Sequence, residues 1–151
     1  MDQPSPLTPR LLFLDDAPDR AATFLAARPG AVWVQTVEQC LELLEQPWDE
    51  IHLDHDLGGE VLVDHERADC GMAVVRWLCE EPRPHLRDTR FIIHTHNSNA
   101  ACMMVLHLQV MGFQVRASPF GVVNPMERGA NPGSLAGRLL RWLGGHSGTI
   151  G

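Results

Sequence analysis

Three short apolar runs in this sequence each end in a group of acidic or histidine residues. Leu11–Leu14 precedes Asp15-Asp16, Ile51–Leu53 precedes Asp54-His55-Asp56, and Phe91–Ile93 precedes His94-Thr95-His96-Asn97. Each run has the length and content of a strand buried in a parallel sheet. If the three strands lie side by side, four carboxylates and three imidazoles meet in one small volume. This pattern favours an α/β sheet and predicts a site at its edge.

The composition is that of a globular domain with an acidic surface. The chain has 151 residues, of which 44% are hydrophobic and 21% charged, and its formal net charge is -7. This length is sufficient to bury one core. The negative charge argues against broad DNA binding, which depends on neutralising phosphates, but is compatible with a small phosphate-bearing ligand. All 12 basic residues are arginines, so the chain contains no lysine.

Nothing in the sequence predicts a membrane partner. No apolar run approaches the ~20 residues that a membrane-spanning helix needs. Residues 1–10 are polar and rich in proline, and they lack the apolar core of a secretion signal. We therefore expect a cytoplasmic protein.

Apolar runs alternate with amphipathic stretches along most of the chain. Strands are expected at residues 11–15, 31–35, 50–54, 90–95 and 113–117. Helices are expected at residues 17–27, 37–45, 70–80, 98–111 and 135–143, the second of them capped by Thr36. We expect residues 1–143 to form one α/β domain and residues 144–151 to form a flexible tail.

Five strands that alternate with five helices predict a parallel sheet covered on both faces. Because crossovers between parallel strands are right-handed, a doubly wound sheet is the simplest fold for this length. In its common flavodoxin-like order, 2-1-3-4-5, strands 1, 3 and 4 are neighbours. Ligands bind such sheets outside the carboxyl ends of the strands. The three polar groups follow strands 1, 3 and 4, so the fold and the site support each other.

Asp15, Asp16, Asp54 and Asp56 are candidate metal ligands. Two carboxylate charges ~4 Å apart repel by roughly 4 kcal/mol at an effective dielectric constant of ~20. Four of them in one crevice therefore need either protonation or a cation. Carboxylates suit Mg²⁺ or Mn²⁺, and an added imidazole shifts the preference toward Mn²⁺ or Zn²⁺. Asp16 has a structural alternative, because an acid at the start of a helix stabilises the helix dipole.

The histidines at the strand ends have different expected roles. His94 and His96 flank one residue, so on an extended chain both side chains share a face and can reach one ion. Where that alternation fails beyond the strand, only His94 points inward. His55 lies between two aspartates and is suited to act as a general acid or to contact an anion. His52 lies on the same face as Asp54 but deeper, where we expect a hydrogen-bonded core residue.

Asp15-Asp16, Asp54 and the segment Ser118-Pro119-Phe120 together resemble the receiver domain of response regulators. In that family the acid pair holds Mg²⁺, the strand-three aspartate accepts a phosphoryl group, and a hydroxyl residue follows strand four, here Thr95. A lysine precedes the Pro-Phe pair in the family, where this sequence has Ser118. Because the chain has no lysine, the resemblance does not extend to ordinary phosphorelay signalling.

A second set of motifs resembles the cyclic-phosphate processing receiver-like family. The matching segments are FLDD at residues 13–16, LDHDLG at 53–58, Gly71 with VVRWL at 74–78, and HTHN at 94–97. The resemblance runs from about Leu11 to Phe120. It implies a receiver fold that acts on cyclic phosphate ends of nucleic acids or on nucleotides.

These residues can be assigned to hydrolysis of a cyclic phosphodiester, on RNA ends that carry a 2′,3′-cyclic phosphate or on cyclic nucleotides. A divalent ion (Mg, Mn or Zn) would activate water and neutralise charge at phosphorus. Its candidate ligands are Asp15, Asp16, Asp54, Asp56 and His96. The candidate catalytic residues are His94 and His55, as sources of the leaving-group proton, and Asp54. The candidate phosphate-binding residues, which carry amides or hydroxyls at the same edge, are Asn97, Thr95, Asn99 and Ser118.

Two other functions fit the same sequence. One is a non-catalytic receiver-like module that binds a partner. The segment Ala100–Met111 favours it, because this helix is apolar nearly all round and a second subunit can cover it in a homodimer. The other is a phosphorylatable receiver with Asp54 as the acceptor. The phosphoesterase hypothesis requires a large loss of activity when Asp54 and His94 are mutated, and the binding module does not.

Overall fold

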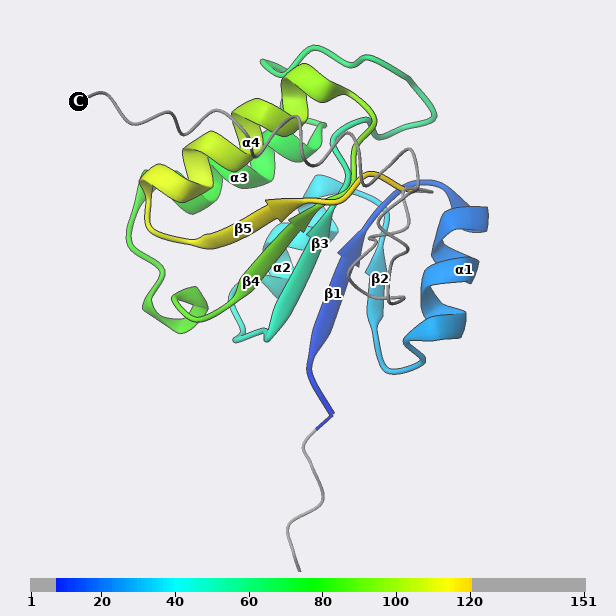
Figure 1. The fold of residues 1–151 in the computed structure, drawn as a ribbon, viewed down its shortest axis with the longest axis horizontal. Helices are drawn as coiled ribbons and strands as arrows, with labels where there is room; N and C mark the ends of the chain where they lie inside the picture. Colours follow the sequence, from blue (N-terminus) through cyan, green and yellow to red (C-terminus); the bar gives the residue numbers. More distant parts are fainter. Residues whose placement is uncertain (1–7, 121–151) are drawn as a thin grey trace, which may run out of the picture. The chain divides into compact units, whose positions relative to one another are not determined.

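The computed structural model describes residues 8–120, and its centre is a five-stranded parallel sheet (Figure 1). The strands are β1 (Leu11–Leu14), β2 (Val32–Val34), β3 (Glu50–Leu53), β4 (Arg90–Ile93) and β5 (Gln114–Ala117). They lie in the order β2-β1-β3-β4-β5. The doubly wound fold predicted from the sequence is therefore confirmed.

Four α-helices and one short 3₁₀-helix connect the strands. They are α1 (Pro18–Ala27), α2 (Val37–Leu43), α3 (Gly71–Glu80), η1 (Pro84–Leu86) and α4 (Ser98–Val110). Thr36 caps α2 by accepting a hydrogen bond from the amide of Gln39, as its position predicts. The predicted helix 135–143 and the predicted tail 144–151 lie outside the described residues. None of the helices within residues 8–120 is long and apolar enough to cross a membrane.

The strand register brings the three polar groups to one edge of the sheet. Leu14 pairs with Leu53 and Leu53 pairs with Ile93, and these are the last residues of their strands. The ladder continues one step further, because the Asp54 amide donates to the Leu14 carbonyl and the His94 amide donates to the Leu53 carbonyl. The polar residues therefore begin where the three central strands end.

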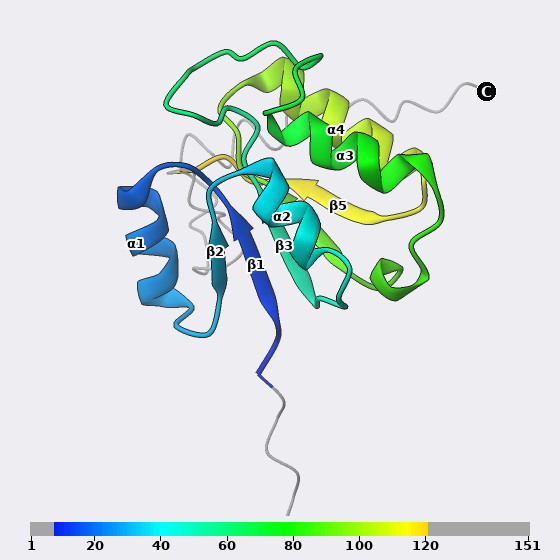
Figure 2. The same ribbon diagram turned by 180° about the vertical axis from the view of Figure 1, so that it is seen from behind.

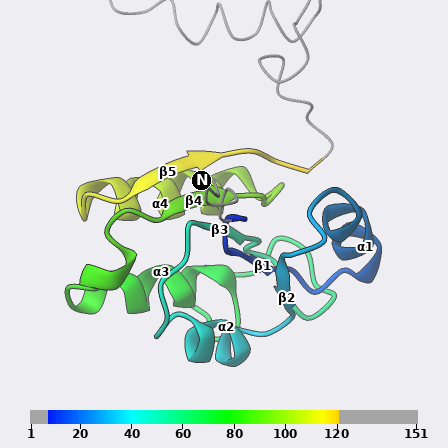
Figure 3. The ribbon, with the colours of Figure 1, turned by 90° about the horizontal axis from the view of Figure 1, so that it is seen from below.

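The two faces of the sheet have different cores. Helices α2, α3 and α4 pack on one face, where the large apolar cluster includes Leu12, Leu53 and Met104. Figure 2 shows α2 and α3 in front of the sheet. On the other face, α1 packs through Phe24 on Phe13, with ring centroids 4.2 Å apart. Figure 3 shows α1 beyond β1 and β2, away from α2 and α3. Alternation along the strands places Phe13, His52 and Asp54 on the α1 face.

Helix α4 is only partly consistent with the even apolar character of its sequence. Ala100, Met104 and Leu108 are buried against the sheet and α3. Leu106 and Val110 point outward and are 56% and 76% exposed. The described part of the domain thus leaves an apolar strip of α4 in contact with solvent.

Candidate functional site

Three carboxylates meet at the carboxyl ends of β1 and β3. Oxygens of Asp15, Asp16 and Asp54 all lie within 4.8 Å of one another, and among the described residues this is the one such group of potential metal ligands. Asp15 is fully buried and Asp54 is 5% exposed. We call Asp15, Asp16 and Asp54 the acid group. Neighbouring strands bring two of its members together, as their positions in the sequence predict.

Arg20 on α1 supplies a positive charge to the acid group, and the sequence analysis did not identify it. Its Nε donates to Asp15 at 2.7 Å, and its Nη2 donates to Asp15 at 2.7 Å and to Asp54 at 2.9 Å. The same nitrogen lies 3.5 Å from Asp16. The hydrogen bond with Asp15 raises the pKa of Arg20 further. The cation that crowded carboxylates require is therefore present, in part, as a side chain.

The environment of Asp54 opposes its ionisation. Burial, and then the neighbouring charge of Asp15, raises the pKa of Asp54 to about 6. The hydrogen bond from the His55 amide and the charge of Arg20 act in the opposite direction. At Asp54, the charge of Arg20 thus does not offset burial and the charge of Asp15.

Asp56, a predicted metal ligand, lies outside the acid group and anchors the loop that follows β3. Its carboxylate accepts hydrogen bonds from the amides of Leu62 at 2.8 Å and Val63 at 3.0 Å, and from the His55 ring at 2.8 Å. Burial acts against ionisation of Asp56, but these hydrogen bonds prevail and lower its pKa. Asp16 also holds this loop, since it accepts a hydrogen bond from the Gly59 amide. It does not cap α1, whose N-cap is Ala17.

His55, a predicted catalytic residue, is fully buried. Its Nδ1 bonds to Asp56, and its Nε2 has no hydrogen-bond partner in the described part of the chain. The start of α3 lies directly against its backbone, because the Gly71 amide donates to the His55 carbonyl at 2.9 Å. A Cβ atom on Gly71 would come within 2.0 Å of the Asp54 carbonyl oxygen, so only glycine fits there. The structure therefore places His55 in the packing between β3 and α3.

His94 turns away from the acid group and pairs with His52. Its Nε2 lies 2.5 Å from His52 Nδ1, and its Nδ1 donates to the Ser118 carbonyl at 2.5 Å. The other nitrogen of His52 bonds to Glu50 at 2.6 Å. This arrangement confirms His52 as a buried, hydrogen-bonded histidine. We call His52 and His94 the histidine pair.

Aromatic rings surround the histidine pair on the α1 face. Phe24 lies 4.7 Å from His52 and Phe120 lies 4.5 Å from His94, measured between ring centroids. Burial among these rings lowers the pKa of His94 to about 4, and it also lowers the pKa of His52. Burial therefore opposes the charged form of both rings, while the contact with Glu50 acts in the opposite direction on His52.

The remaining predicted site residues lie at the start of α4, except Ser118, which follows β5. Asn97 caps this helix, with its side-chain oxygen accepting from the Ala100 amide at 3.1 Å, and its NH₂ group lies 3.5 Å from Asp56. Thr95 is buried, and its hydroxyl oxygen accepts from the Asn97 amide. His96 and Asn99 are exposed. Ser118 contributes its carbonyl to His94 and its amide to Ile93. Of these residues, Asn97 alone contacts the polar groups that follow β3.

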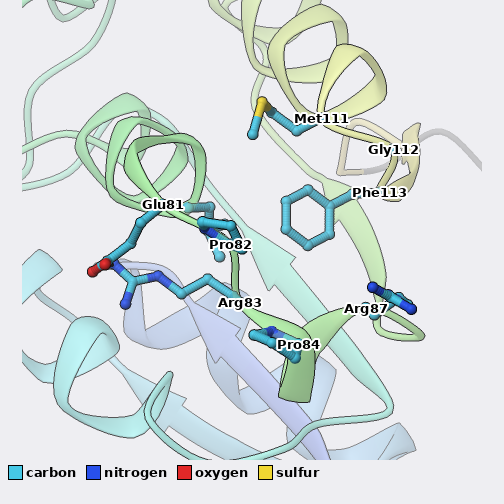
Figure 4. Close-up of a pocket in the computed structure, with 9 residues that line it drawn as sticks. Glu81, Pro82, Arg83, Pro84, Arg87, Met111, Gly112 and Phe113 are labelled. Atoms are coloured by element: carbon cyan, nitrogen blue, oxygen red, sulfur yellow. The ribbon is translucent and has the colours of Figure 1, made fainter.

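Two open cavities lie at opposite ends of the strands. One of about 470 Å³ adjoins the acid group through Asp16 and is bordered by Thr36, Glu38 and Gly59. The other, of about 420 Å³, lies between the end of α3 and the residues that precede β5 (Figure 4). Arg83 on its wall lies 3.5 Å over the Trp77 ring. The cavity beside Asp16 is therefore the one positioned to receive a ligand of the acid group.

Comparisons with known proteins agree with this geometry. A family model described as "Cyclic-phosphate processing Receiver domain" matches residues 10–110. The signal receiver domain of a signal transduction histidine kinase from Syntrophus aciditrophicus superposes with a TM-score of 0.50 at 20% sequence identity. That match covers 94% of this chain and 95% of the other. No curated protein matches the sequence. The structural likeness, at this identity, shows the receiver fold.

Proposed function

Because this chain belongs to the family of cyclic-phosphate processing receiver domains, we propose that it is a metal-dependent phosphoesterase. Its substrates would be 2′,3′-cyclic phosphates, at RNA ends or in cyclic nucleotides. The observation that carries this proposal is the acid group, in which three carboxylates converge within 4.8 Å at the edge where parallel sheets bind ligands.

The acid group fits a hard divalent cation. Its donors are all carboxylate oxygens, which Mg²⁺ and Mn²⁺ prefer, and no imidazole joins them to favour Zn²⁺. Burial, and then the charge of Asp15, keeps the pKa of Asp54 raised despite Arg20, so a further positive charge would stabilise the ionised carboxylate. Asp15, Asp16 and Asp54 would hold the ion. When bound, it would activate a water molecule and neutralise charge at phosphorus.

Solvent water is a more accessible source of the proton for the leaving oxygen than the two predicted histidines. His55 is fully buried. Both nitrogens of His94 are engaged, and its ring is neutral near pH 7. The Arg20 side chain, by contrast, is 36% exposed, so water reaches the acid group. We therefore assign His94 and His55 to positioning the strand ends, and we assign delivery of the proton to water.

Hydrolysis of 2′,3′-cyclic nucleotides in the presence of Mg²⁺ or Mn²⁺ tests this function. We expect turnover by the purified protein, loss of turnover with a chelator, and a large loss in Asp15→Asn. Asp19→Asn is the matched control, since Asp19 is exposed in the first turn of α1. Folded protein that shows no turnover with either ion would refute the proposal.

A second candidate function is a non-catalytic module that binds through α4. It is favoured by the exposed apolar strip, which includes Leu106, Val110 and Met111. In this function Arg20 serves as a permanent counterion of the acid group, and the partner is a second copy of the chain. Sedimentation of the protein at micromolar concentration tests this function, because the binding module requires a dimer and a monomer would exclude it.

A further inference from the structure

We propose that Arg20 is the phosphate-binding residue of this site, held by the carboxylates until a divalent ion replaces it there. The inference rests on the proposed function for the identity of the anion, and on the structure for the position of the guanidinium. Arg20 bonds to Asp15 and Asp54, the members contributed by the two neighbouring strands. It thus lies where those two carboxylates would share an ion.

The charges of the acid group are consistent with one divalent ion together with Arg20. Three carboxylates and one guanidinium leave two negative charges, which a single divalent cation balances. Since Asp15 and Asp54 are almost fully buried, an uncompensated charge is costly there. The ion and Arg20 can therefore coexist once the guanidinium gives up its direct bonds to the carboxylates.

The guanidinium is placed so that it can turn toward a ligand. Its Nε and Nη2 face the carboxylates, while no hydrogen bond from its Nη1 is found within residues 8–120. Its side chain is 36% exposed, and its central carbon lies 5.7 Å from the Phe120 ring centroid. A planar group with five donors can bind two phosphate oxygens at once.

No other cation is positioned for this task in the described part of the chain. Arg20 alone makes ion pairs with Asp15, Asp16 and Asp54. The sequence contains no lysine, so the basic group must be an arginine. A phosphate that enters a site of three carboxylates needs a positive side chain as well as an ion, and Arg20 meets this need.

Metal binding tests the first half of the inference without any substrate. Mn²⁺ is titrated calorimetrically into wild type, Arg20→Met and Arg28→Met. It should bind Arg20→Met about tenfold more tightly than the other two proteins, because no guanidinium then competes for the carboxylate oxygens. Arg28 is the matched control, since it is the C-cap residue that follows α1 and lies over the Phe24 ring. Equal or weaker Mn²⁺ binding by Arg20→Met would overturn the proposed exchange.

Phosphate binding tests the second half. Inorganic phosphate titrated into the protein loaded with Mg²⁺ should bind wild type and Arg28→Met alike, and Arg20→Met at least tenfold more weakly. Arg20→Lys keeps the charge but loses the planar guanidinium that can bind two phosphate oxygens at once. We therefore expect it to bind phosphate about threefold more weakly than wild type. If Arg20→Met fails to fold, as judged by circular dichroism, Arg20→Lys decides. Phosphate affinity equal to wild type in the deciding variant would refute the assignment.

The outcomes separate this inference from the proposed function. If wild type turns over no cyclic nucleotide but both titrations respond to Arg20 as expected, the phosphoesterase proposal fails and the role of Arg20 stands. If wild type is active and Arg20→Met keeps its KM for the cyclic nucleotide, the role of Arg20 fails and the phosphoesterase proposal stands.

Discussion

The acid group and the histidine pair lie on the same face of the same sheet, yet they have opposite environments. The acid group lies just beyond the strand ends, beside the partly exposed side chain of Arg20. The histidine pair turns back into the strands, where Phe13, Phe24 and Phe120 enclose it. Residues that follow neighbouring strands therefore need not share a site, because the rotation of one side chain decides which environment it enters.

The two clusters also differ in which protonation state burial opposes. In the acid group, burial raises the pKa of Asp54, so the charged carboxylate is the form that burial destabilises. In the histidine pair, burial lowers the pKa of His94, so the charged imidazolium is the form that burial destabilises. A charged acid group can attract an ion, whereas burial and mutual hydrogen bonding fit the histidine pair for packing. Four predictions test this contrast.

The largest expected effect is on catalysis. Asp54→Asn should lower kcat for 2′,3′-cyclic nucleotides by roughly 10³-fold, since it removes one ligand of the proposed ion. His94→Gln should lower kcat by less than about tenfold, because the ring does not face the acid group. Steady-state kinetics at saturating Mg²⁺ measures both. Comparable losses in the two variants would return His94 to the catalytic role that its sequence position suggested.

The next effect is on the backbone beneath the acid group. Gly71→Ala should lower the free energy of unfolding by about 3 kcal/mol, because its Cβ would lie 2.0 Å from the Asp54 carbonyl oxygen and 2.9 Å from the His55 Cα. Urea denaturation measures it. Gly30→Ala is the control, since a Cβ there meets nothing within 4 Å. An unchanged stability in Gly71→Ala would mean that α3 does not hold this end of β3.

Opposite pH dependences are expected in the metal-free protein. The folded pKa of Asp54 is about 6, above the usual aspartate value of 3.8, so between these pH values the folded state holds a proton that the unfolded chain has lost. The contribution of Asp54 to stability therefore falls as pH rises. The folded pKa of His94 is about 4, below 6.5, so its contribution rises with pH over that window.

Single variants separate these opposing contributions. Relative to wild type, Asp54→Asn should gain up to about 3 kcal/mol of unfolding free energy as the pH rises from 4 to 6. His94→Gln should lose a similar advantage over wild type between pH 4 and 6.5. Urea unfolding in a chelating buffer measures both. Parallel curves for the two variants would contradict the contrast between the clusters.

The smallest effect is expected at the exposed strip of α4. Val110 is 76% exposed, so Val110→Asp should change the unfolding free energy by no more than about 0.5 kcal/mol and leave kcat unchanged. Chemical denaturation and the cyclic nucleotide assay check this. If the wild type sediments as a dimer and Val110→Asp as a monomer, the strip is an interface and the binding function gains support.

The fold and the acid group could be predicted from the sequence because both depend on strands. Apolar runs define the strands, and the strand order then places Asp15 and Asp54 at the same edge of the sheet. This placement depends on the backbone and not on the orientation of the two side chains. Asp56 was harder to predict, because its partners are the Leu62 and Val63 amides of an irregular loop. No periodic pattern fixes the path of such a loop.

Arg20 and the orientation of His94 depend on contacts that sequence patterns do not reveal. The direction of the His94 ring is set by His52 and Ser118, which lie 42 and 24 residues away in the chain. Arg20 left one usable signal, since it follows Asp16 by four residues across the start of a helix. A cation at that spacing from an acid at a helix start lies on the same side of the helix, above the edge of the sheet.

The hydrogen bond from the Gly59 amide to Asp16 connects the acid group to the loop that follows β3. One carboxylate belongs both to the proposed ion site and to the anchorage of the loop after β3. Occupancy of the site and the path of that loop are then thermodynamically linked, so whatever strengthens one alters the other by the same free energy. A protein or nucleic acid that binds residues 57–63 would therefore change the affinity of the acid group for the ion without contacting the acid group.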